Sequence, residues 1–337
     1  MLKLQEISAT DLDNYVAKQH PEANFLQTSN WGKVNELDHK KTFYLGLYND
    51  GELTGSAMVI LKPAKRGRYL EIPGGPLLNW QDEKQVDAFM NGIRKIADRE
   101  KCVFVRMRPN IPDTEENRAI AKHIGLVESP MHLHAEHTVM LDLTKSEDEL
   151  LTEMRRQTRY EVRRSAKLGI TVESSTEKQA FEDFYHLQSE TAKRQNFIPP
   201  SREFLLFQHE VFGGQAKIYT AKIDGKVLAQ GLVLLQKPEA IYNEAASSEE
   251  GRKYPGAYAL QWQVIKDAKK LGLKRYNLFG IAPPNSPHHR YAGVTTFKCG
   301  FGGEQIAYLH ARDLVIKPVH YKAVQLLEKA RKKHRHL

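Results

Sequence analysis

The spacing of apolar positions switches several times along the chain between the period of a helix and that of a strand. Each switch predicts a boundary between a helix and a strand. In the first half, helical spacing and flanking cap residues alternate with short apolar or alternating runs. The expected helices lie at 11–19, 30–37, 83–99 and 115–124, and the expected strands at 42–48, 53–61, 68–72, 102–107 and 134–143.

The second half repeats much of this order. The expected strands lie at 170–173, 217–223, 227–235, 240–247 and 275–279, followed by terminal strands from 296 to 315, and the expected helices at 178–194, 202–211 and 257–271. A repeat of this length is typical of a duplicated supersecondary unit.

Two predicted hairpins superpose directly. FYLGLYNDGELTGSAMVIL aligns with KIYTAKIDGKVLAQGLVLL, so that Asp50-Gly51 falls on Asp224-Gly225. Both dipeptides suit a tight turn that requires positive φ. Each hairpin is followed by a third strand, a helix and an apolar strand. We therefore interpret the chain as two copies of one α/β domain; two unrelated units that share a common hairpin are the alternative.

The element order resembles the GCN5-related N-acetyltransferase fold. We expect an α/β protein with mixed sheets in two tandem domains, at 1–145 and 146–314, with 315–337 completing the first. Such domains hold a pyrophosphate where the helix after the third strand begins. In the second copy, Gly256 and Ala257 stand there, preceded by Arg252 and Lys253. A plain helix start explains such a glycine corner equally well. The matching corner EIPGGPLLNW lacks a following basic residue.

Charge and composition indicate which class of partner the protein binds and in which cellular compartment it resides. The 50 basic and 41 acidic residues give a net charge of +9, which favours RNA, a nucleotide or a phosphorylated substrate. No apolar run is long enough for a membrane helix, and the N-terminal segment lacks the features of an export signal, so we expect a cytoplasmic protein without an integral membrane segment. Cys102 and Cys299 resemble small buried residues rather than a disulfide or metal ligands.

Several segments across the chain together resemble the Fem (FemABX) family of non-ribosomal peptidyltransferases, and its FemX-like members in particular. They are QTSNWGKV, GGPLL, HTVMLDLTKSEDELL, RRQTRYEVRRSAKLGITV, IYNEAASSEE, YALQWQVIKDAKKLGLKRYNLFGI and TTFKCGFGGE. The resemblance implies twin acetyltransferase-like domains. It also implies transfer of an amino acid from aminoacyl-tRNA to an amine of the peptidoglycan stem peptide, a step of cross-bridge synthesis in cell-wall assembly.

The resemblance also bears on the acceptor. Family members use UDP-MurNAc-pentapeptide or its lipid-linked form, and some insert a long coiled-coil arm. Between Thr176 and Phe212 there is room only for ordinary helices. The chain therefore resembles the armless members, which use the UDP-linked precursor, and no DNA partner is implied.

Phe297 and Lys298 correspond to a phenylalanine-lysine pair of the family, in which the lysine is thought to steady the developing negative charge. An aminoacyl ester is already activated, so the reaction needs positioning and oxyanion stabilisation, and no metal or organic cofactor. A lysine flanked by apolar residues on a strand is costly to bury, which favours a function. A lysine that snorkels to the sheet edge is the alternative.

Further residues match family positions that bind the precursor. Lys33, which follows Trp31, matches a lysine that contacts the precursor's phosphates. Arg202 lies within a residue or two of the family's second phosphate-binding position. Tyr242 and Glu244 alternate on one face of their predicted strand, which lines the peptide groove in the family. Tyr254 and Tyr258 of the glycine corner complete the expected substrate-binding residues.

Three positions depart from the family pattern. Arg108 stands in VRMRPN where some members carry an aspartate once considered a base, and an arginine cannot abstract a proton. We expect Arg108 to pair with a carboxylate of the stem peptide or precursor instead. Asn277 stands where aspartate is frequent. Glu244 also replaces an aromatic residue of some members.

The segment EMRRQTRYEVRRSAK places Arg155, Arg159 and Arg163 four residues apart, which predicts one positive stripe on a helix. RNA phosphates suit such a stripe, and a solvated linker helix is the alternative. The C-terminal LEKARKKHRHL is a second basic run.

Three histidines, at 132, 134 and 137, invite a zinc interpretation. Strand alternation and the lack of cysteine or carboxylate partners nearby favour ordinary strand-edge histidines, so we expect no metal.

Two other functions fit the same features. One is an acyl-CoA-dependent N-acyltransferase of the same fold, and the other is a non-catalytic RNA-binding module. The sequence leaves open which amino acid is transferred, which amine accepts it, what accepts the proton, whether the precursor is soluble or lipid-linked, and the oligomeric state.

Overall fold

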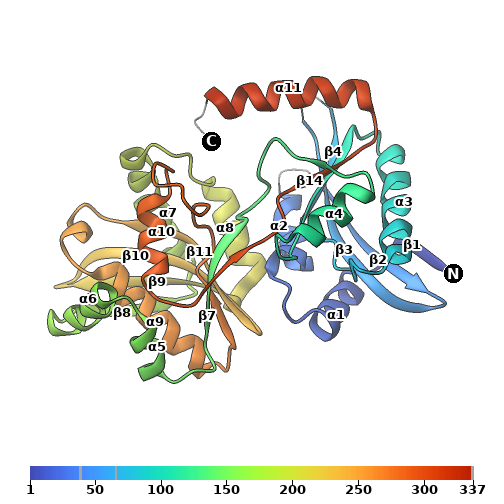
Figure 1. The fold of residues 1–337 in the computed structure, drawn as a ribbon. Helices are drawn as coiled ribbons and strands as arrows, with labels where there is room; N and C mark the ends of the chain where they lie inside the picture. Colours follow the sequence, from blue (N-terminus) through green and yellow to red (C-terminus); the bar gives the residue numbers. More distant parts are fainter. Residues whose placement is uncertain (38–39, 65–66, 335–337) are drawn as a thin grey trace. The chain divides into compact units, whose positions relative to one another are not determined.

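The computed structural model describes residues 1–37, 40–64 and 67–334. The chain forms two compact units, one made of Met1–Glu136 with Ala307–Leu337 and the other of His137–Ile306. Each unit is built on a mixed seven-stranded sheet. Figure 1 shows the chain coloured along its sequence.

The first sheet has the strand order β1-β2-β3-β4-β5-β14-β6. These strands are β1 (Leu2–Glu6), β2 (Lys41–Asn49), β3 (Glu52–Lys62), β4 (Tyr69–Gly74), β5 (Phe104–Pro109), β14 (Arg312–Val315) and β6 (Val127–Glu128). The helices of this unit are α1 (Ala9–Gln19), η1 (Phe25–Gln27), α2 (Ser29–Glu36), α3 (Glu83–Arg99), α4 (Glu115–His123) and α11 (Pro318–His334).

The second sheet, taken from its other edge, has the matching order β8-β9-β10-β11-β12-β7-β13. Its strands are β8 (Thr171–Ser175), β9 (Ala216–Ile223), β10 (Lys226–Gln236), β11 (Glu239–Ser247), β12 (Arg275–Asn277), β7 (His137–Asp142) and β13 (Glu304–Ala307). The helices are α5 (Glu147–Glu153), α6 (Arg156–Lys167), α7 (Lys178–Gln195), α8 (Arg202–Phe212), η2 (Gly213–Gln215), η3 (Glu250–Lys253), α9 (Gly256–Lys270) and α10 (Ala292–Cys299).

The two sheets correspond strand by strand. In each, the fourth and fifth strands run parallel (β4 with β5, β11 with β12), whereas the first four strands pair antiparallel with one another and the sixth pairs antiparallel with the fifth. The two Asp-Gly turns also match, because Asp50 and Asp224 both have φ of 48° and the glycines after them have φ of 92° and 75°. Such two-residue turns agree with the twist of the flanking strands. The predicted duplication is thus confirmed.

The sixth strand of each sheet comes from the segment that follows the other repeat. β7 follows the first repeat but pairs with β12 of the second sheet, and β14 follows the second repeat but pairs with β5 of the first. In Figure 1, the green β7 accordingly lies with the yellow and orange strands. The unit boundaries therefore fall at 136 and 307, earlier than the expected domain boundaries at 145 and 315.

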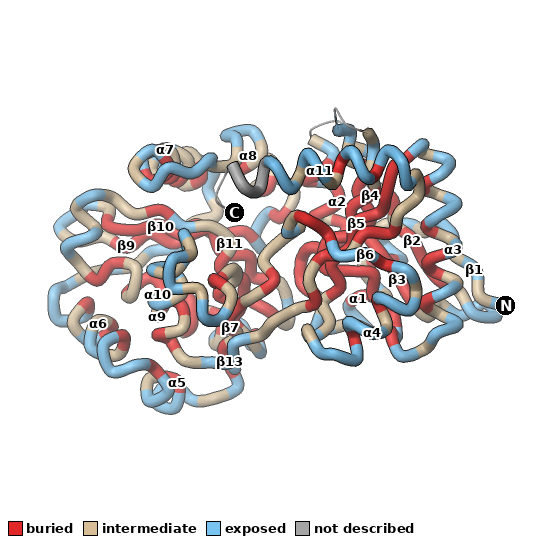
Figure 2. Tube along the Cα trace, turned by 45° about the horizontal axis from the view of Figure 1, so that its top comes forward, coloured by how far each residue is buried: buried red, intermediate tan, exposed pale blue. Residues whose placement is uncertain are grey.

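Each sheet buries its own apolar core. In the first unit, Phe43, Leu45 and Leu47 alternate along β2 and pack with Phe89 and Ile93 of α3. Asp82 caps α3 by accepting the N–H groups of residues 84 and 85, so this helix begins where the sequence predicts. Figure 2 shows buried positions following the strands, whereas much of α5 and α6 is exposed.

One predicted element is wrong. Residues 296–299, expected to begin the terminal strands, lie in α10, and the strands begin only at β13. The β-branched Thr295 and Thr296 favour an extended interpretation, but their hydroxyls donate to the carbonyls of Tyr291 and Ala292, one helical turn back. The sequence prediction also missed β1, which is only five residues long.

The sequence predicts neither a coiled-coil arm nor a membrane-spanning segment. Between β8 and β9 the chain forms only α7, α8 and the short η2, so this region holds no coiled-coil arm. Within the described part of the chain, every helix is too short or too polar to cross a bilayer. The last residues of the basic run at 327–337 lie outside the described residues.

Candidate active site

Lys298 is a buried lysine of the second unit. It lies in the last turn of α10, and its side-chain Nζ donates to the carbonyl oxygens of Gly280 at 2.8 Å and Phe279 at 3.2 Å. Only 8% of the residue is exposed, and burial lowers the pKa of Lys298 to about 8. Lys298 was expected on a strand, and its position on a helix corrects that expectation. Its burial is as expected, so it does not snorkel to a sheet edge.

The carbonyls that Lys298 contacts are presented by a turn after β12. The side-chain Oδ1 of Asn277 accepts the backbone N–H of Phe279 at 2.9 Å, and the hydroxyl of Thr138 donates to the same oxygen. Phe279 has a φ of 57°, which is rare for a bulky side chain. Asn277 is buried and thereby shapes the loop that binds the lysine. No pattern in the sequence pointed to Thr138.

Aromatic side chains line the surroundings of Lys298. The ring of Tyr242 lies 5.9 Å from Nζ of Lys298. Phe297 packs edge-on against Tyr258 at 5.0 Å and against Phe301 at 5.2 Å between ring centroids. Four of the expected site residues, Lys298, Phe297, Tyr242 and Tyr258, therefore belong to one neighbourhood of the second unit.

Glu244 does not belong to that neighbourhood. A β-bulge interrupts β11, because Leu232 pairs with Glu244 whereas the next residue, Val233, pairs with Tyr242. The extra residue reverses the alternation of faces. Glu244 accepts a hydrogen bond from Gln188 of α7, whereas Tyr242 packs in the core that includes α9. The expectation that the two side chains share a face is therefore wrong.

The glycine corner before α9 has a packing explanation. A Cβ on Gly251 would lie 1.9 Å from the carbonyl oxygen of Leu228, and one on Gly256 would lie 2.6 Å from the Leu228 side chain. Both glycines are thus required for contact with β10. Tyr254 is half-buried at this corner. Arg252 and Lys253 are exposed, and Lys253 pairs with Glu250.

The matching corner of the first unit is filled by protein. Gln27 donates to the carbonyl of Pro73 at 2.7 Å and accepts the N–H of Met58 at 2.9 Å. A Cβ on Gly75 would lie 2.6 Å from the Gln27 side chain. Gly75 in this corner therefore accommodates the Gln27 side chain.

Trp31 and Lys33 lie on α2 of the first unit with opposite environments. Trp31 is buried and packs edge-on against Phe25 at 5.0 Å between centroids. Lys33 is exposed, and it has no ion pair with any residue that the structure describes. Trp31 therefore anchors the helix, and Lys33 is available to an anion.

Arg108 is buried at the end of β5, with 1% of its surface exposed. Its Nη1 donates to Asn110 Oδ1 at 2.8 Å, and its guanidinium lies 5.3 Å from the Tyr308 ring centroid. Burial lowers the pKa of Arg108 to about 10. In the described residues its Nε atom lacks a hydrogen-bond partner. A substrate carboxylate can reach Arg108 only if the surrounding loops move.

The remaining arginines of the expected binding sites differ in whether they already have partners within the protein. Arg202 at the start of α8 forms an ion pair with Glu182 of α7. Arg155 and Arg163 are exposed at the ends of the expected stripe on α6. Arg159 between them donates to the carbonyls of residues 151 and 152. The stripe is therefore helical as predicted, but its central arginine holds α5 to α6.

The histidines are arranged differently from the expectation. His132 and His134 precede β7 rather than lying at its edge. His132 contacts the carboxylate of Glu136, and so does His310, which lies 174 residues away from Glu136 along the chain. No local spacing could have predicted the contribution of His310.

The chain is similar in sequence to a known protein family. A profile described as the FemAB family matches residues 7–227 and 224–329. The Lipid II:glycine glycyltransferase of Staphylococcus aureus (strain USA300) is 25% identical over 298 residues, covering 83% of this chain and 66% of that protein. The chain thus spans slightly less than two thirds of that relative's length.

Solved structures share the fold. The crystal structure of FemX matches with a TM-score of 0.86 at 18% identity, covering 96% of this chain and 100% of that one. A tandem GNAT protein from the clavulanic acid biosynthesis pathway matches with a TM-score of 0.56 at 12% identity, covering 94% and 99%. The expected fold of two acetyltransferase-like repeats is confirmed.

Proposed function

Because the chain belongs to the FemAB family, we propose that it is an aminoacyltransferase that moves an amino acid from aminoacyl-tRNA to an amine of the peptidoglycan stem peptide. The buried ammonium of Lys298 is the observation that carries this proposal. The relatives named Lipid II:glycine glycyltransferase support a peptidoglycan precursor as the acceptor.

The chemistry needs one well-placed cation. The amine attacks the ester carbon, a C–N bond forms, the C–O bond to the tRNA ribose breaks, and the amine proton ends on the released hydroxyl. A protonated lysine has three N–H donors, and Lys298 uses two on the Phe279 and Gly280 carbonyls. The third N–H is assigned to the oxyanion that forms on the ester carbonyl, where a charge in a buried site acts most strongly.

The precursor's phosphates need a second cation. Lys33 suits this role, because its exposed ammonium makes no ion pair among the described residues. Arg202 would first have to leave its ion pair with Glu182. Lys33 is therefore the stronger candidate for binding the precursor.

The tRNA donor is assigned to the second unit. Arg155 and Arg163 at α6 are exposed, and the backbone N–H of Arg155 donates to the carbonyl of Gly300, two residues after Lys298, at 2.9 Å. Burial raises the pKa of Tyr258 and of Cys299, and the charge of Arg155 opposes both shifts, so this guanidinium lies near the aromatic neighbours of Lys298. RNA phosphates suit two such exposed guanidinium groups.

A transfer assay tests the proposal. The purified chain is incubated with labelled aminoacyl-tRNA and with either UDP-MurNAc-pentapeptide or the lipid-linked precursor, and the product peptide is identified by mass spectrometry. We expect the peptide to gain one aminoacyl residue only when aminoacyl-tRNA is present. Lys298→Met should lower kcat at least about a hundredfold, as expected for loss of an oxyanion donor. Lys270→Met, at an exposed position of the same unit, is the matched control.

One observation favours a second candidate, an acyl-CoA-dependent N-acyltransferase. Pro255 precedes α9 and provides no side-chain cap, so the first N–H groups of this helix are free of a cap bond that would compete with pyrophosphate. Replacing aminoacyl-tRNA by acetyl-CoA in the same assay separates the two. Acyl transfer from the thioester alone would contradict the tRNA-dependent function. RNA binding without any transfer would instead support a non-catalytic module.

A further inference from the structure

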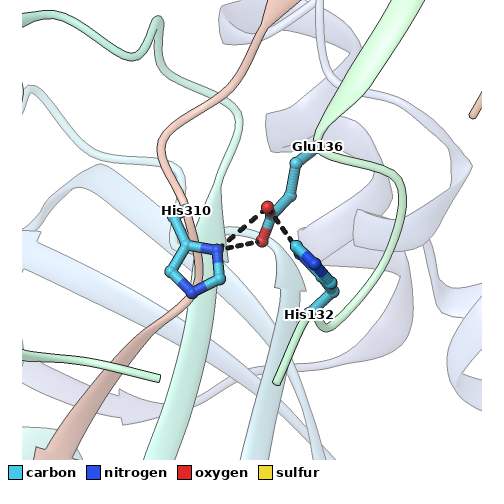
Figure 3. A group of neighbouring side chains, drawn as sticks. All are labelled: His132, Glu136 and His310. Carbon is cyan, nitrogen blue, oxygen red and sulfur yellow. Dashed lines mark hydrogen bonds and ion pairs between the residues drawn. The ribbon is translucent and has the colours of Figure 1, made fainter. Parts of the chain in front are cut away.

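Three side chains of the first unit gather around one carboxylate. Figure 3 shows Glu136 between the rings of His132 and His310. The Oε2 atom of Glu136 lies 2.7 Å from Nδ1 of His132 and 2.9 Å from Nδ1 of His310. One nitrogen or oxygen atom from each of the three residues lies within 4.8 Å of the others. Nδ1 of His310 also lies 2.8 Å from the other oxygen, Oε1, so two imidazole nitrogens face one carboxylate.

The groups behind this cluster hold it in the arrangement that metal ligands need. The Nε2 atom of His310 lies 2.8 Å from the carbonyl oxygen of Ser129, which can only accept, so Nε2 carries a proton. The other oxygen of Glu136 accepts the N–H of Ala311 at 3.1 Å. Metal-bound histidines usually donate their second N–H to a carbonyl or carboxylate, and metal-bound carboxylates are themselves hydrogen-bonded.

We propose that His132, Glu136 and His310 form a site for a divalent transition metal, with Zn²⁺ as the favoured ion. Two imidazole nitrogens and one carboxylate oxygen suit Zn²⁺ and disfavour Mg²⁺ and Ca²⁺, which prefer oxygen ligands. The ion takes the place of the Nδ1 protons that both histidines direct at Glu136. The His310 proton leaves to solvent, and His132 binds as the tautomer that carries its one proton on Nε2. Water occupies the fourth position of a tetrahedral site.

The geometry requires only a small adjustment. Zinc bonds of about 2.0–2.1 Å in a tetrahedral site separate ligand atoms by roughly 3.3 Å, so each imidazole moves outward from the carboxylate by about half an ångström. The His132 side chain is about half exposed, at 51%, and lies in the segment before β7, so its outward movement meets little resistance. Glu136 is buried and fixed, which makes it the anchor of the site.

The location gives the site a structural role. His132 and Glu136 lie on the segment that leads into β7, and His310 lies on the segment that leads into β14. These are the two strands that the repeats exchange. A metal bridging the two leading segments links them within the first unit, and we expect it to raise the thermal stability of that unit.

Cobalt spectroscopy on untagged protein, first stripped with a chelator, tests the site. We expect about one Co²⁺ per chain, with the visible absorption bands of tetrahedral coordination, which Zn²⁺ then abolishes by displacement. His132→Ala should weaken Co²⁺ binding at least about tenfold. His123→Ala, which removes an exposed histidine of α4 in the same unit, should leave binding unchanged.

Two further measurements distinguish loss of the metal site from loss of the fold. Circular dichroism verifies that His132→Ala is folded, and thermal unfolding with and without Zn²⁺ gives a second readout that needs no substrate. We expect Zn²⁺ to raise the Tm of the wild type and of His123→Ala but not of His132→Ala. Failure to bind Co²⁺ at about 100 µM, or equal binding by the wild type and His132→Ala, would show that the cluster is only a hydrogen-bonded network.

Discussion

Nζ of Lys298 lies 2.8 Å from the carbonyl oxygen of Gly280. No carboxylate forms an ion pair with this ammonium in the described part of the chain, so two carbonyl dipoles and the ring of Tyr242 offset its burial. Burial accordingly lowers the pKa of Lys298 from 10.5 to about 8. The group is still mostly protonated at neutral pH. The first two predictions follow from this lowered pKa.

The first prediction concerns the pH dependence of transfer. If the protonated lysine stabilises the oxyanion, kcat should fall as the pH rises through about 8. Single-turnover rates between pH 6 and 10 give the profile. In Lys298→Arg, any remaining activity should not show this decline, because the guanidinium stays charged. An unchanged decline in that variant would assign the titration to another group.

The second prediction concerns stability. Between pH 8 and 10.5 the folded protein loses the Lys298 proton while the unfolded chain retains it. The unfolded state then binds more protons, so the free energy of unfolding rises with pH, by up to about 3 kcal/mol from this group. Urea unfolding of the wild type and of Lys298→Met isolates the effect, because the stability difference between them should shift in favour of the wild type across this window. A constant difference would contradict the lowered pKa.

The third prediction concerns Asn277 as a positioning residue. Asn277→Ala removes the acceptor for the Phe279 N–H, and we expect it to lower kcat at least about tenfold with little change in KM. Asn277→Asp retains an acceptor oxygen and should restore much of the rate. A merely structural role would instead lower both variants' activity in proportion to their loss of folded protein, which circular dichroism measures.

The fourth prediction concerns the buried pair between Arg106 and Asp313. The guanidinium of Arg106 donates to both carboxylate oxygens of Asp313, at 2.8 and 2.9 Å, and joins β5 to β14. Asp313→Ala should lower the free energy of unfolding by about 3–5 kcal/mol, because it leaves a buried charge without its main partner. The exposed pair of Arg118 with Asp113 has the same two-bond geometry. Asp113→Ala should therefore cost less than about 1 kcal/mol in chemical denaturation.

The fifth prediction concerns tRNA. Reversing both exposed charges, with Arg155→Glu and Arg163→Glu, should weaken tRNA binding at least about tenfold and reduce its salt dependence. Filter binding at several salt concentrations measures both quantities. Lys84→Glu with Lys95→Glu, on α3 of the first unit, changes the net charge equally. Equal weakening by the two double variants would indicate a general charge effect rather than a binding surface on α6.

Local patterns were sufficient for much of the fold. The two hairpins and α3 could be predicted because alternation, Asp-Gly turns and the Asp82 cap act over a few residues. The exchange of β7 and β14 could not, since the Arg106–Asp313 contact spans 207 residues. Such pairing depends on which strand edges are open after the rest of the sheet has formed.

In the candidate site, too, some features could be predicted from local patterns and others could not. The apolar neighbours of Lys298 correctly predicted a buried ammonium, although the hydroxyls of Thr295 and Thr296 stabilise a helix where alternation suggests a strand. The environment of Glu244 was mispredicted because one extra residue in β11 changes which face a side chain occupies. A single-residue bulge leaves no reliable mark in an otherwise regular strand sequence.

The late position of β14 has a consequence for biosynthesis. Residues 137–306 form a continuous unit, so all of it has been translated before the ribosome reaches Arg312. The first unit, although its synthesis begins earlier, has to wait with an open gap between β5 and β6 until β14 emerges. Domains usually complete their folding in the order of synthesis. In this chain the order is reversed, and the nascent N-terminal half is the part that needs protection from aggregation until translation is nearly finished.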